Sequence, residues 1–373
     1  MKTYFAPAIQ RFLPMMLVLL AGMSCGITDA VADADPGLFT VSGFATLGAT
    51  HSSNQNADYT STFYQPTGAG YSHRYDVDDD TKVGIQLGAQ FTNQLSAVVQ
   101  VVTEYRDNNR FTPAVEWANI RYAFTPNFSV RLGRVELPTF FSADVRDVGF
   151  ANPWVRPPLE VYSINPVTNS DGVDFSYRLH AGAVSNTLRL LYGDSVFHIS
   201  PGEIRVAGDG ILGLFDTIEY RDITAHLGYE RATISVTSLP GLPVRGYSAG
   251  VLYDPGRAFV QAELSRMTAD TLTPGYISGY VTVGYRVRKF TPYVTFAREF
   301  SMGRPVQSTD HNTGQNTWSI GTRWDVANNV DLKLQFDHVS MPAGSYGLLF
   351  PKSTTYQLGS GANVLSVCLD FVF

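Results

Sequence analysis

The residues between 82 and 92 alternate strictly between apolar and polar or small side chains. Val83, Ile85, Leu87, Ala89 and Phe91 share one parity, and Lys, Gly, Gln and Thr occupy the positions between them. Because successive side chains of a β-strand point to opposite faces of a sheet, this segment predicts a strand with one apolar and one polar face. The pattern recurs along almost the whole chain. It therefore restricts the fold to one in which most strands separate an apolar environment from water.

The recurrence of this pattern predicts about 16 strands joined alternately by short and long connections, which is typical of bacterial membrane barrels. The expected strands cover residues 39–50, 82–92, 95–106, 114–124, 128–133, 172–180, 186–193, 211–220, 223–237, 247–253, 258–266, 276–285, 290–298, 317–324, 330–339 and 362–373. Long loops are expected at 51–80, 135–170, 194–210, 267–275, 299–316 and 340–361. We expect an all-β protein, a transmembrane antiparallel β-barrel.

Composition favours this fold over the alternative of a soluble β-sandwich. The chain has 33 Gly, 20 Tyr and 23 Phe among 373 residues, only 16% of its residues are charged, and its mean hydropathy is −0.04. Alternating lipid-facing and water-facing residues average to such a near-neutral value. A sandwich of two packed sheets is usually shorter than this chain. Tyr and Phe also cluster at predicted strand ends, as in the aromatic girdles of membrane barrels.

The first residues predict export. Lys2 and Arg11 precede the apolar stretch 12–23, and Ala30-Val31-Ala32 provides a small-residue cleavage site, so residues 1–32 are expected to be a signal peptide. A retained anchor and lipid attachment at Cys25 are the alternatives. The apolar stretch is shorter than the roughly 20 residues that a spanning helix needs. Residues 33–373 are expected to form one barrel domain, in which Cys368 has no partner for a disulfide.

The last predicted strand carries a signature at the end of the printed sequence. Leu365, Val367, Leu369, Phe371 and Phe373 share one parity, and the final residue is aromatic. A closed barrel must pair its last strand with its first, because unpaired backbone groups are costly in lipid. The residues match the terminal signature of outer-membrane proteins, so Phe371 and Phe373 are expected to be the signal read by the barrel-assembly machinery.

The region from 132 to 173 resembles the Gram-negative outer-membrane porin family. It has a Leu-Gly-Arg strand end at 132–134, a long loop at 135–170 and a return strand that begins Asp-Gly-Val at 171–173. The Pro-Trp-Val-Arg-Pro-Pro run at 153–158 is richer in Pro than the family pattern. The resemblance implies that the loop after the fifth strand folds inward and constricts a pore. It also implies an outer-membrane homotrimer, in contact with lipid and lipopolysaccharide, that passes small hydrophilic solutes and ions by passive diffusion.

A constricted channel needs fixed charges, because opposed acidic and basic walls orient polar solutes and weight ions by sign. The charges expected at the constriction loop are Asp144, Asp147, Glu160, Arg146 and Arg156. Strand parity predicts a basic wall facing the lumen at Lys82, Arg121, Arg131, Arg178 and Arg189, with Arg134 as a weaker candidate. For each residue taken alone, the alternative is a solvated or salt-bridged lumen side chain with no effect on selectivity.

Other functional classes lack sequence support. No nucleophile motif, zinc motif or phosphate-binding glycine loop is present, so no enzyme, cofactor or metal site is expected. Asp76 to Asp80 begins like a calcium loop, but Thr81 replaces the required Gly, and a solvated rim is the preferred interpretation. The net charge of −6 disfavours nucleic acid as a partner. Two alternatives remain for the barrel, a substrate-selective channel and a plugged barrel that acts as an adhesin or receptor.

Overall fold

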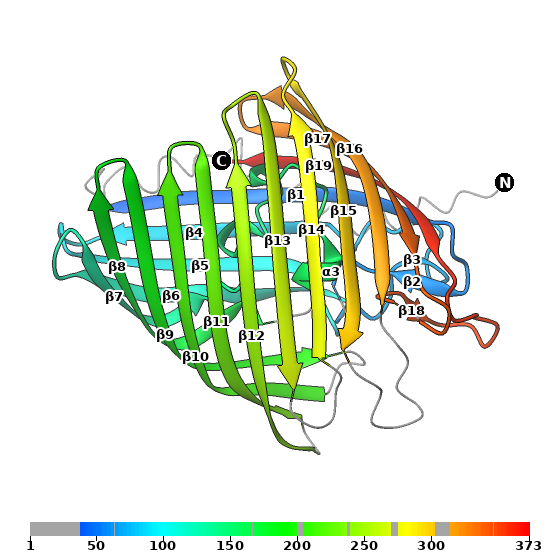
Figure 1. Cartoon of the computed structure of the whole chain (residues 1–373), viewed down its shortest axis with the longest axis horizontal. Coiled ribbons are helices and arrows are strands. Elements are labelled where there is room, and N and C mark those ends of the chain that lie inside the picture. The colour runs from blue at the N-terminus through cyan, green and yellow to red at the C-terminus, as the bar shows by residue number, and fades with distance from the viewer. Residues whose placement is uncertain are drawn as a thin grey trace.

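A computed structural model describes residues 38–62, 64–163, 165, 167–199, 204–236, 239–269, 275–302, 314–345 and 347–373. Within these ranges, sixteen antiparallel strands close into one barrel, so the expected all-β barrel is confirmed (Figure 1). The barrel strands are β1 (Phe39–Ser52), β4 (Lys82–Gln90), β5 (Leu95–Tyr105), β6 (Phe111–Ala123), β7 (Phe128–Glu136), β8 (Asn169–Ala181), β9 (Val184–Ile199), β10 (Ile204–Tyr220), β11 (Ile223–Val236), β12 (Leu239–Tyr253), β13 (Ala258–Ala269), β14 (Gly275–Tyr285), β15 (Phe290–Met302), β16 (Gln315–Ala327), β17 (Val330–Ser340) and β19 (Ala362–Val372). Each predicted strand overlaps one of them. The expected signal peptide, with Cys25, lies outside the described residues.

The barrel closes where β19 pairs with both β17 and β1. At the seam, the amide of Phe373 donates to the carbonyl of Gly43 at 3.0 Å, and the amide of Gly43 donates to the carbonyl of Phe373 at 2.9 Å. The final residue therefore completes the backbone ladder between last and first strands. Closure leaves no open sheet edge, which is the condition for placing a sheet in hydrocarbon.

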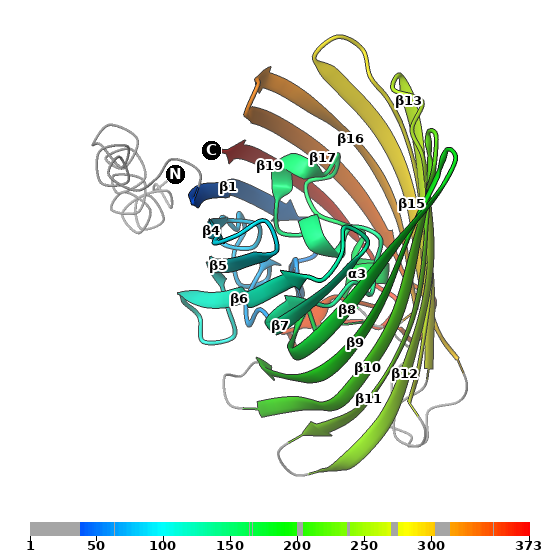
Figure 2. The ribbon, with the colours of Figure 1, turned by 90° about the vertical axis from the view of Figure 1, so that its left-hand side faces the viewer.

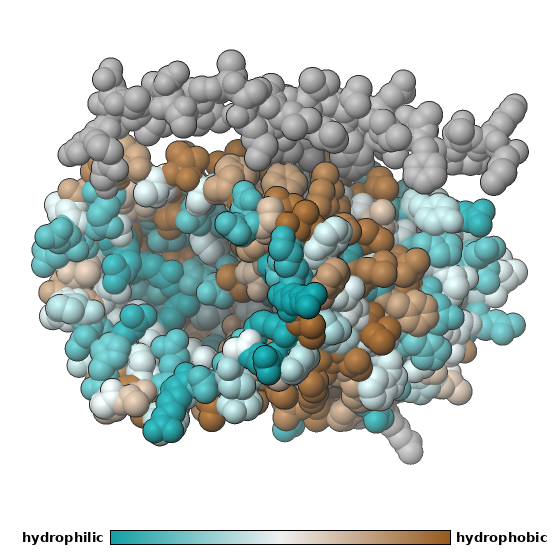
Figure 3. Space-filling model, turned by 90° about the horizontal axis from the view of Figure 1, so that it is seen from above, coloured by the Kyte–Doolittle hydropathy of each residue, from teal (hydrophilic) through white to brown (hydrophobic). Residues whose placement is uncertain are grey.

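The outer face of the barrel is apolar. Alternate residues of neighbouring strands expose large hydrophobic side chains, such as Leu87, Leu132, Leu264 and Ile320. Figure 3, seen from the side of the short turns, shows a broad hydrophobic area beside hydrophilic side chains gathered around a hollow. Aromatic residues mark the short-turn ends of several strands, as the girdle prediction requires; they include Phe91, Phe124, Tyr177, Tyr253, Tyr285 and Phe290.

Four buried aromatic rings on the inner face lie over glycines of neighbouring strands. A Cβ atom added to Gly84 would lie 2.3 Å from the Phe44 ring, and one added to Gly284 would lie 2.2 Å from the Phe259 ring. The other two pairs of this kind are Phe215 with Gly228 and Tyr293 with Gly321. Phe44 is the one bulky residue that breaks the alternation of the first strand, and this fit explains how the inner face accommodates it. Such contacts fix strand register and fill the gap above a glycine.

The two ends of the barrel differ. Turns such as 124–127 and 221–222 are short, whereas the opposite end carries the long connections, two of which form a small sheet of β2 (Ala57–Tyr59), β3 (Ala69–Gly70) and β18 (Phe350–Pro351). The expectation of a long loop at 194–210 is wrong, because β9 and β10 stay paired out to Ile199 and Ile204. A bulge between Gly208 and Ile211 shifts the register there and breaks the alternation that marks a strand.

Helical segments lie only in the loop after β7 among the described residues. They are η1 (Ala143–Val145), η2 (Gly149–Ala151) and α3 (Leu159–Tyr162). None of the helices in the described ranges is long and apolar enough to cross a membrane. Cys368, the one cysteine of residues 38–373, is fully buried on the inner face of β19 next to Gly48.

Candidate functional site: an inward-folded loop and a charged lumen

The loop that joins β7 to β8 lies inside the barrel (Figure 2). β7 is the fifth barrel strand along the chain, so the inward-folded loop expected between 135 and 170 is confirmed. Its helical segments contact different parts of the wall: η2 contacts β1 and β19, and α3 contacts β13, β14 and β15. The loop therefore crosses the lumen and divides the space inside the barrel.

Trp154 fixes the middle of the loop to the wall. Its indole Nε1 donates to the hydroxyl oxygens of Thr282 at 3.0 Å and Thr295 at 3.2 Å, and its ring meets that of Tyr280 edge-on at 5.7 Å. The side chain is 1% exposed. A buried indole whose N–H is satisfied combines a large apolar contact with a directional bond, so it holds the loop in one position.

Two wall carboxylates bind the two ends of the loop. Glu263 of β13 accepts from the Phe141 amide at 2.8 Å and from the Tyr162 hydroxyl at 3.3 Å. Glu230 of β11 accepts from the Asn165 amide group at 2.7 Å and the Thr139 hydroxyl at 2.9 Å. Their lumen parity was visible in the sequence, but nothing there indicated that they would anchor the loop.

Arg156 and Glu160 were predicted as constriction charges, and the structure buries both. Arg156 Nε donates to Asp80 Oδ1 at 2.8 Å, and the same guanidinium contacts the hydroxyls of Tyr59 and Ser366. Although burial alone would raise the pKa of Asp80, Arg156 more than offsets it and lowers that pKa below its ordinary value. Burial raises the pKa of Glu160, which accepts from the Gln315 amide group at 2.7 Å.

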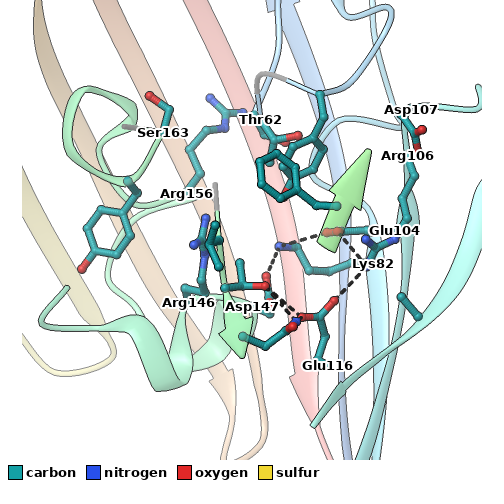
Figure 4. A pocket seen from close by; sticks show the side chains of 18 of the residues that line it. Thr62, Lys82, Glu104, Arg106, Asp107, Glu116, Arg146, Asp147, Arg156 and Ser163 are labelled. Atoms are coloured by element: carbon teal, nitrogen blue, oxygen red, sulfur yellow. Dashed lines mark hydrogen bonds and ion pairs between the residues drawn. The ribbon is translucent and has the colours of Figure 1, made fainter. Parts of the chain in front are cut away.

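A water-accessible cavity of about 520 Å³ remains between the loop and the β4–β6 wall (Figure 4). Charges of alternating sign line it. Lys82 Nζ lies 3.1 Å from Asp147 Oδ1 of the loop and 3.9 Å from Glu104 Oε2. Arg106 continues the series, at 3.2 Å from Glu104 and 3.0 Å from Glu116. The predicted contact between a basic wall and an acidic loop thus occurs at Lys82 and Asp147, but the wall itself is mixed in charge.

A second group of charges lies on the wall formed by β7, β8 and β9. Arg131 contacts Glu136 at 2.8 Å and Asp174 at 2.7 Å. Arg189 contacts the same two carboxylates at 2.9 and 3.2 Å. The parity prediction that Arg131 and Arg189 face the lumen agrees with this geometry. Their positive charge is balanced by two acids that the basic-wall prediction did not include.

Arg121 and Arg178 lie apart from the loop charges, near the short-turn ends of β6 and β8. Arg121 Nε donates to the Ser129 hydroxyl at 3.2 Å, and Arg178 Nε donates to the Thr187 hydroxyl at 3.4 Å. Both side chains are exposed. Arg134, the weaker candidate, binds Asp171 at 2.6 Å. The predicted wall is therefore divided into separate groups.

Asp144 and Arg146 are the remaining two charges predicted for the constriction loop. Neither forms an ion pair with a described residue. Asp144 is exposed, and partial enclosure together with the nearby Glu136 carboxylate raises its pKa. Arg146 lines the cavity, and its guanidinium carbon lies 6.0 Å from the centre of the Tyr162 ring. Burial alone would raise the pKa of the Asp147 carboxyl, but the nearby Lys82 and Arg146 lower it below the ordinary value.

Glu116 shows why sequence parity missed part of this site. It has the parity of Ala118, a position assigned to the apolar face. The register between β5 and β6 shifts between Gln100 and Val101, and the resulting bulge turns Glu116 inward, where it is 8% exposed. A bulge inserts one unpaired residue and so reverses the faces to which the residues beyond it point. Alternation alone cannot locate such a shift in a strand that is otherwise regular.

The acidic segment that ends at Asp80 is not the solvated rim that was expected. Asp76, Asp79 and Asp80 are buried, and Asp76 Oδ1 accepts from the amides of Asp78 and Asp79 at 2.8 and 2.9 Å. The Asp76 carboxylate shapes the turn that leads into β4, and the Asp80 carboxylate binds Arg156. No group of three His, Cys, Asp or Glu residues in the described ranges is arranged to hold a metal ion.

The comparisons with known proteins give structural neighbours only. No model of a known protein family matches the sequence, and no curated protein sequence matches it. An anion-selective porin from Comamonas acidovorans has 14% identity and a TM-score of 0.60, over 90% of this chain and 99% of its own.

Two other structures cover 90% of this chain and 98% of their own. They are OmpF of Salmonella typhi in complex with daunomycin, at 13% identity and a TM-score of 0.59, and OmpT of Vibrio cholerae, at 12% identity and a TM-score of 0.54. The similarity extends over nearly the whole of each neighbour. The chain has the porin fold, that of a sixteen-stranded outer-membrane β-barrel with the loop after its fifth strand folded into the lumen.

Proposed function

We propose that this protein is a passive diffusion channel for small hydrophilic solutes and ions across the bacterial outer membrane. The observation that carries the proposal is the cavity of about 520 Å³ between the inward loop and the β4–β6 wall, which is lined by charged side chains of both signs. A plug would occupy this space, which the described residues leave open. Polar, charged lining instead favours water and dissolved ions.

The arrangement of charges supports selection by sign and by dipole orientation. Asp147 on the loop faces Lys82 on the wall, and Arg146 adds a positive charge at the same cavity that forms no ion pair with a described residue. In a narrow lumen with low-dielectric walls, such fixed charges act over several ångströms with little screening. No step of chemistry is required of any residue, so we propose transport without catalysis or a cofactor.

The assembly that we propose is a homotrimer embedded in outer-membrane lipid and lipopolysaccharide and inserted by the barrel-assembly machinery. One structural neighbour, OmpT of Vibrio cholerae folded in vitro, is described as a trimer form. The apolar terminal strand that ends at Phe373 supports the proposal that the barrel-assembly machinery recognises this protein. Residues 1–32 are proposed to be the cleaved signal peptide.

The proposal is tested by inserting the purified, folded protein into planar bilayers. We expect stepwise increases in current that are proportional to voltage at low potentials. Folding is checked by gel electrophoresis in sodium dodecyl sulfate, in which a folded barrel keeps its mobility after mild heating. A protein that folds and inserts but never conducts would contradict the proposal.

Replacing the two loop acids tests the location of the constriction. Asp144→Asn with Asp147→Asn removes two negative charges of the loop, one of which pairs with Lys82, so reversal potentials in a KCl gradient should move toward anion selectivity. Glu160→Gln is the matched control, because it removes one charge of the same loop at a side chain that is 2% exposed and bound to Gln315. Unchanged reversal potentials in the double variant would show that these acids do not lie on the conducting path.

A substrate-selective channel is the second candidate, and Arg146 is the observation that favours it. Its guanidinium lines the cavity without an ion pair among the described residues, so it is available to a carboxylate or phosphate group of a solute. A selective channel would show saturable block of the ion current by one anionic solute. Arg146→Gln should then abolish the block while ohmic conductance remains.

A further inference from the structure

The cavity between the inward loop and the β4–β6 wall has two chemically different sides. In Figure 4 the side chains of Lys82, Glu104 and Arg106 lie on the wall side, and those of Arg146 and Ser163 lie on the loop side. Most of the apolar lining comes from the loop and from the end of β9, and it includes Val155, Pro157, Leu159, Val167, Val196 and Phe197. A solute in the cavity therefore meets ion pairs on one side and apolar groups on the other.

Phe197 is an aromatic side chain of this lining whose position is fixed by packing. It is opposite Val206 in the ladder between β9 and β10, and it packs against the buried apolar cluster that includes Val167 and Leu191. The side chain is half-buried, so part of its surface remains open to the cavity. A pre-formed apolar surface of this kind favours binding of an apolar group, because no side chain has to be ordered first.

Arg146 is the one Lys or Arg of the cavity lining that forms no ion pair with a described residue. Its guanidinium carbon lies 6.0 Å from the centre of the Tyr162 ring. The other four cations of the lining each have a carboxylate at 3.1 Å or less: Lys82 has Asp147, Arg106 has Glu116, Arg134 has Asp171 and Arg156 has Asp80. An anion that binds in this cavity is therefore directed to Arg146, on the side that carries most of the apolar lining.

The charges of the cavity favour an anion with a single charge. A guanidinium binds a carboxylate through two parallel hydrogen bonds, so one carboxylate suffices to occupy Arg146. On the wall side, Glu104 and Glu116 are bound to Arg106, but Asp107 lines the cavity without an ion pair to a described residue. A second negative charge on the solute would face these carboxylates and be repelled. The remainder of the solute is then best uncharged, and an apolar group is stabilised by contact with the apolar side.

We infer that the cavity is a binding site for small monocarboxylates that carry an aromatic or branched apolar group. The carboxylate binds Arg146, and the apolar group contacts Phe197 and the apolar residues of the loop. The inference rests on the proposed function, because such a solute reaches the cavity through a water-filled lumen, and it gives the substrate-selective alternative a solute class. The cavity volume of about 520 Å³ falls within the range of about 300–1,000 Å³ that is usual for small-molecule sites.

The test measures binding of benzoate, acetate and inorganic phosphate to the folded protein in a nonionic detergent by isothermal titration calorimetry, with the weaker anions measured in competition against benzoate. We expect saturable binding of benzoate with an affinity about tenfold higher than that of acetate, because the ring removes apolar surface from water while the charge is the same. Arg146→Gln should abolish measurable benzoate binding. Arg146→Lys should retain part of it, since the charge remains but the two parallel hydrogen bonds do not.

Phe197→Ser tests the apolar side of the site. It should lower the affinity for benzoate toward that for acetate and leave acetate binding unchanged. The matched controls are Arg110→Gln, which removes an exposed arginine from the turn after β5, and Tyr71→Ser, which removes an exposed aromatic from a long loop. Neither residue lines the cavity, so neither variant should change the affinity for benzoate. The comparison of benzoate with acetate in the wild-type protein decides the inference even if Phe197→Ser does not fold.

Equal affinities of the wild-type protein for benzoate and acetate would overturn the inference, and so would phosphate that binds as tightly as benzoate. An affinity for benzoate that is unchanged in Arg146→Gln, or lowered equally in Arg110→Gln, would place the carboxylate elsewhere and overturn it as well. The binding measurement does not require conduction, which bilayer recordings of the same protein test separately. A protein that conducts without binding benzoate contradicts this inference alone, whereas one that binds benzoate without conducting contradicts the proposed channel function alone.

Discussion

Trp154 attaches the middle of the loop to the opposite wall through full burial and two hydrogen bonds. Trp154→Ala should lower the free energy of unfolding by about 3–5 kcal/mol, the range for removing a large buried aromatic. Denaturant titration in lipid vesicles measures this loss. Trp154→Phe keeps most of the apolar contact and loses only the N–H bonds, so it should cost distinctly less. Equal, small losses for both variants would mean that the loop is held elsewhere.

Asp144 is expected to contribute a pH dependence to the channel's ion selectivity. Enclosure and the Glu136 carboxylate raise its pKa, so its charge is lost at a higher pH than that of a free Asp. Lys82 and Arg146 lower the pKa of Asp147 despite its burial, so that residue stays charged over the same range. Cation preference should therefore decline as pH falls, and Asp144→Asn should reduce this decline. Reversal potentials measured from about pH 7 to about pH 4 compare the two proteins; identical profiles would exclude Asp144 as the titrating group.

Individual side chains show where the alternation of apolar and polar residues predicts the correct face of the barrel and where it does not. Lys82, Arg131 and Arg189 face the lumen as alternation predicts, because each lies in a regular stretch of strand. Parity assigned Glu116 to the wrong face because it lies beside a bulge. The burial of Arg156 was not predictable either, since its partner Asp80 belongs to a distant loop whose path depends on packing.

At the scale of elements, the bond between Arg156 and Asp80 joins the inward loop to the segment between β3 and β4. Arg156→Met leaves the Asp80 carboxylate buried without its partner, so it should destabilise the barrel by about 3–5 kcal/mol. Adding Asp80→Asn removes one of the two buried carboxylates that Arg156 contacts, the other being Asp337 at 3.7 Å, and should restore part of that loss. Denaturant titration of both variants, with Asp80→Asn alone for comparison, gives the coupling between the two residues. If the loss in the double variant equals the sum of the losses in the two single variants, this pair does not link the two elements.

Strands and loops differ in how well the sequence specifies them. All sixteen barrel strands were located because each must separate lipid from water, which imposes a period of two on its residues. The loop after β7 was identified by its length and position. Its contacts with Glu230, Glu263 and Gln335 depend on the closed shape of the wall, which no local pattern encodes.

For the whole molecule, the contact between Phe373 and Gly43 is the end of the ladder that closes the barrel. Deleting Phe373 removes the two backbone hydrogen bonds between these residues and the ring that covers Gly43. We expect a clear reduction in the yield of heat-resistant, folded barrel, measured by gel mobility after refolding into lipid vesicles. Phe91→Ala is the control, because it removes an aromatic that is 50% exposed near the short turns without touching the seam. Equal yields for the deletion and the wild type would mean that β19 pairs correctly without its last residue.

The sealed position of Cys368 makes the protein suitable for site-specific labelling. Its thiol is fully buried in the wall of β19, and no other cysteine occurs in residues 38–373. A bulky maleimide dye would therefore react with a cysteine introduced at an exposed turn and not with the native one. One dye on a short turn and another on a long loop would report the distance between the two rims in a single molecule, without prior removal of any native thiol from the barrel.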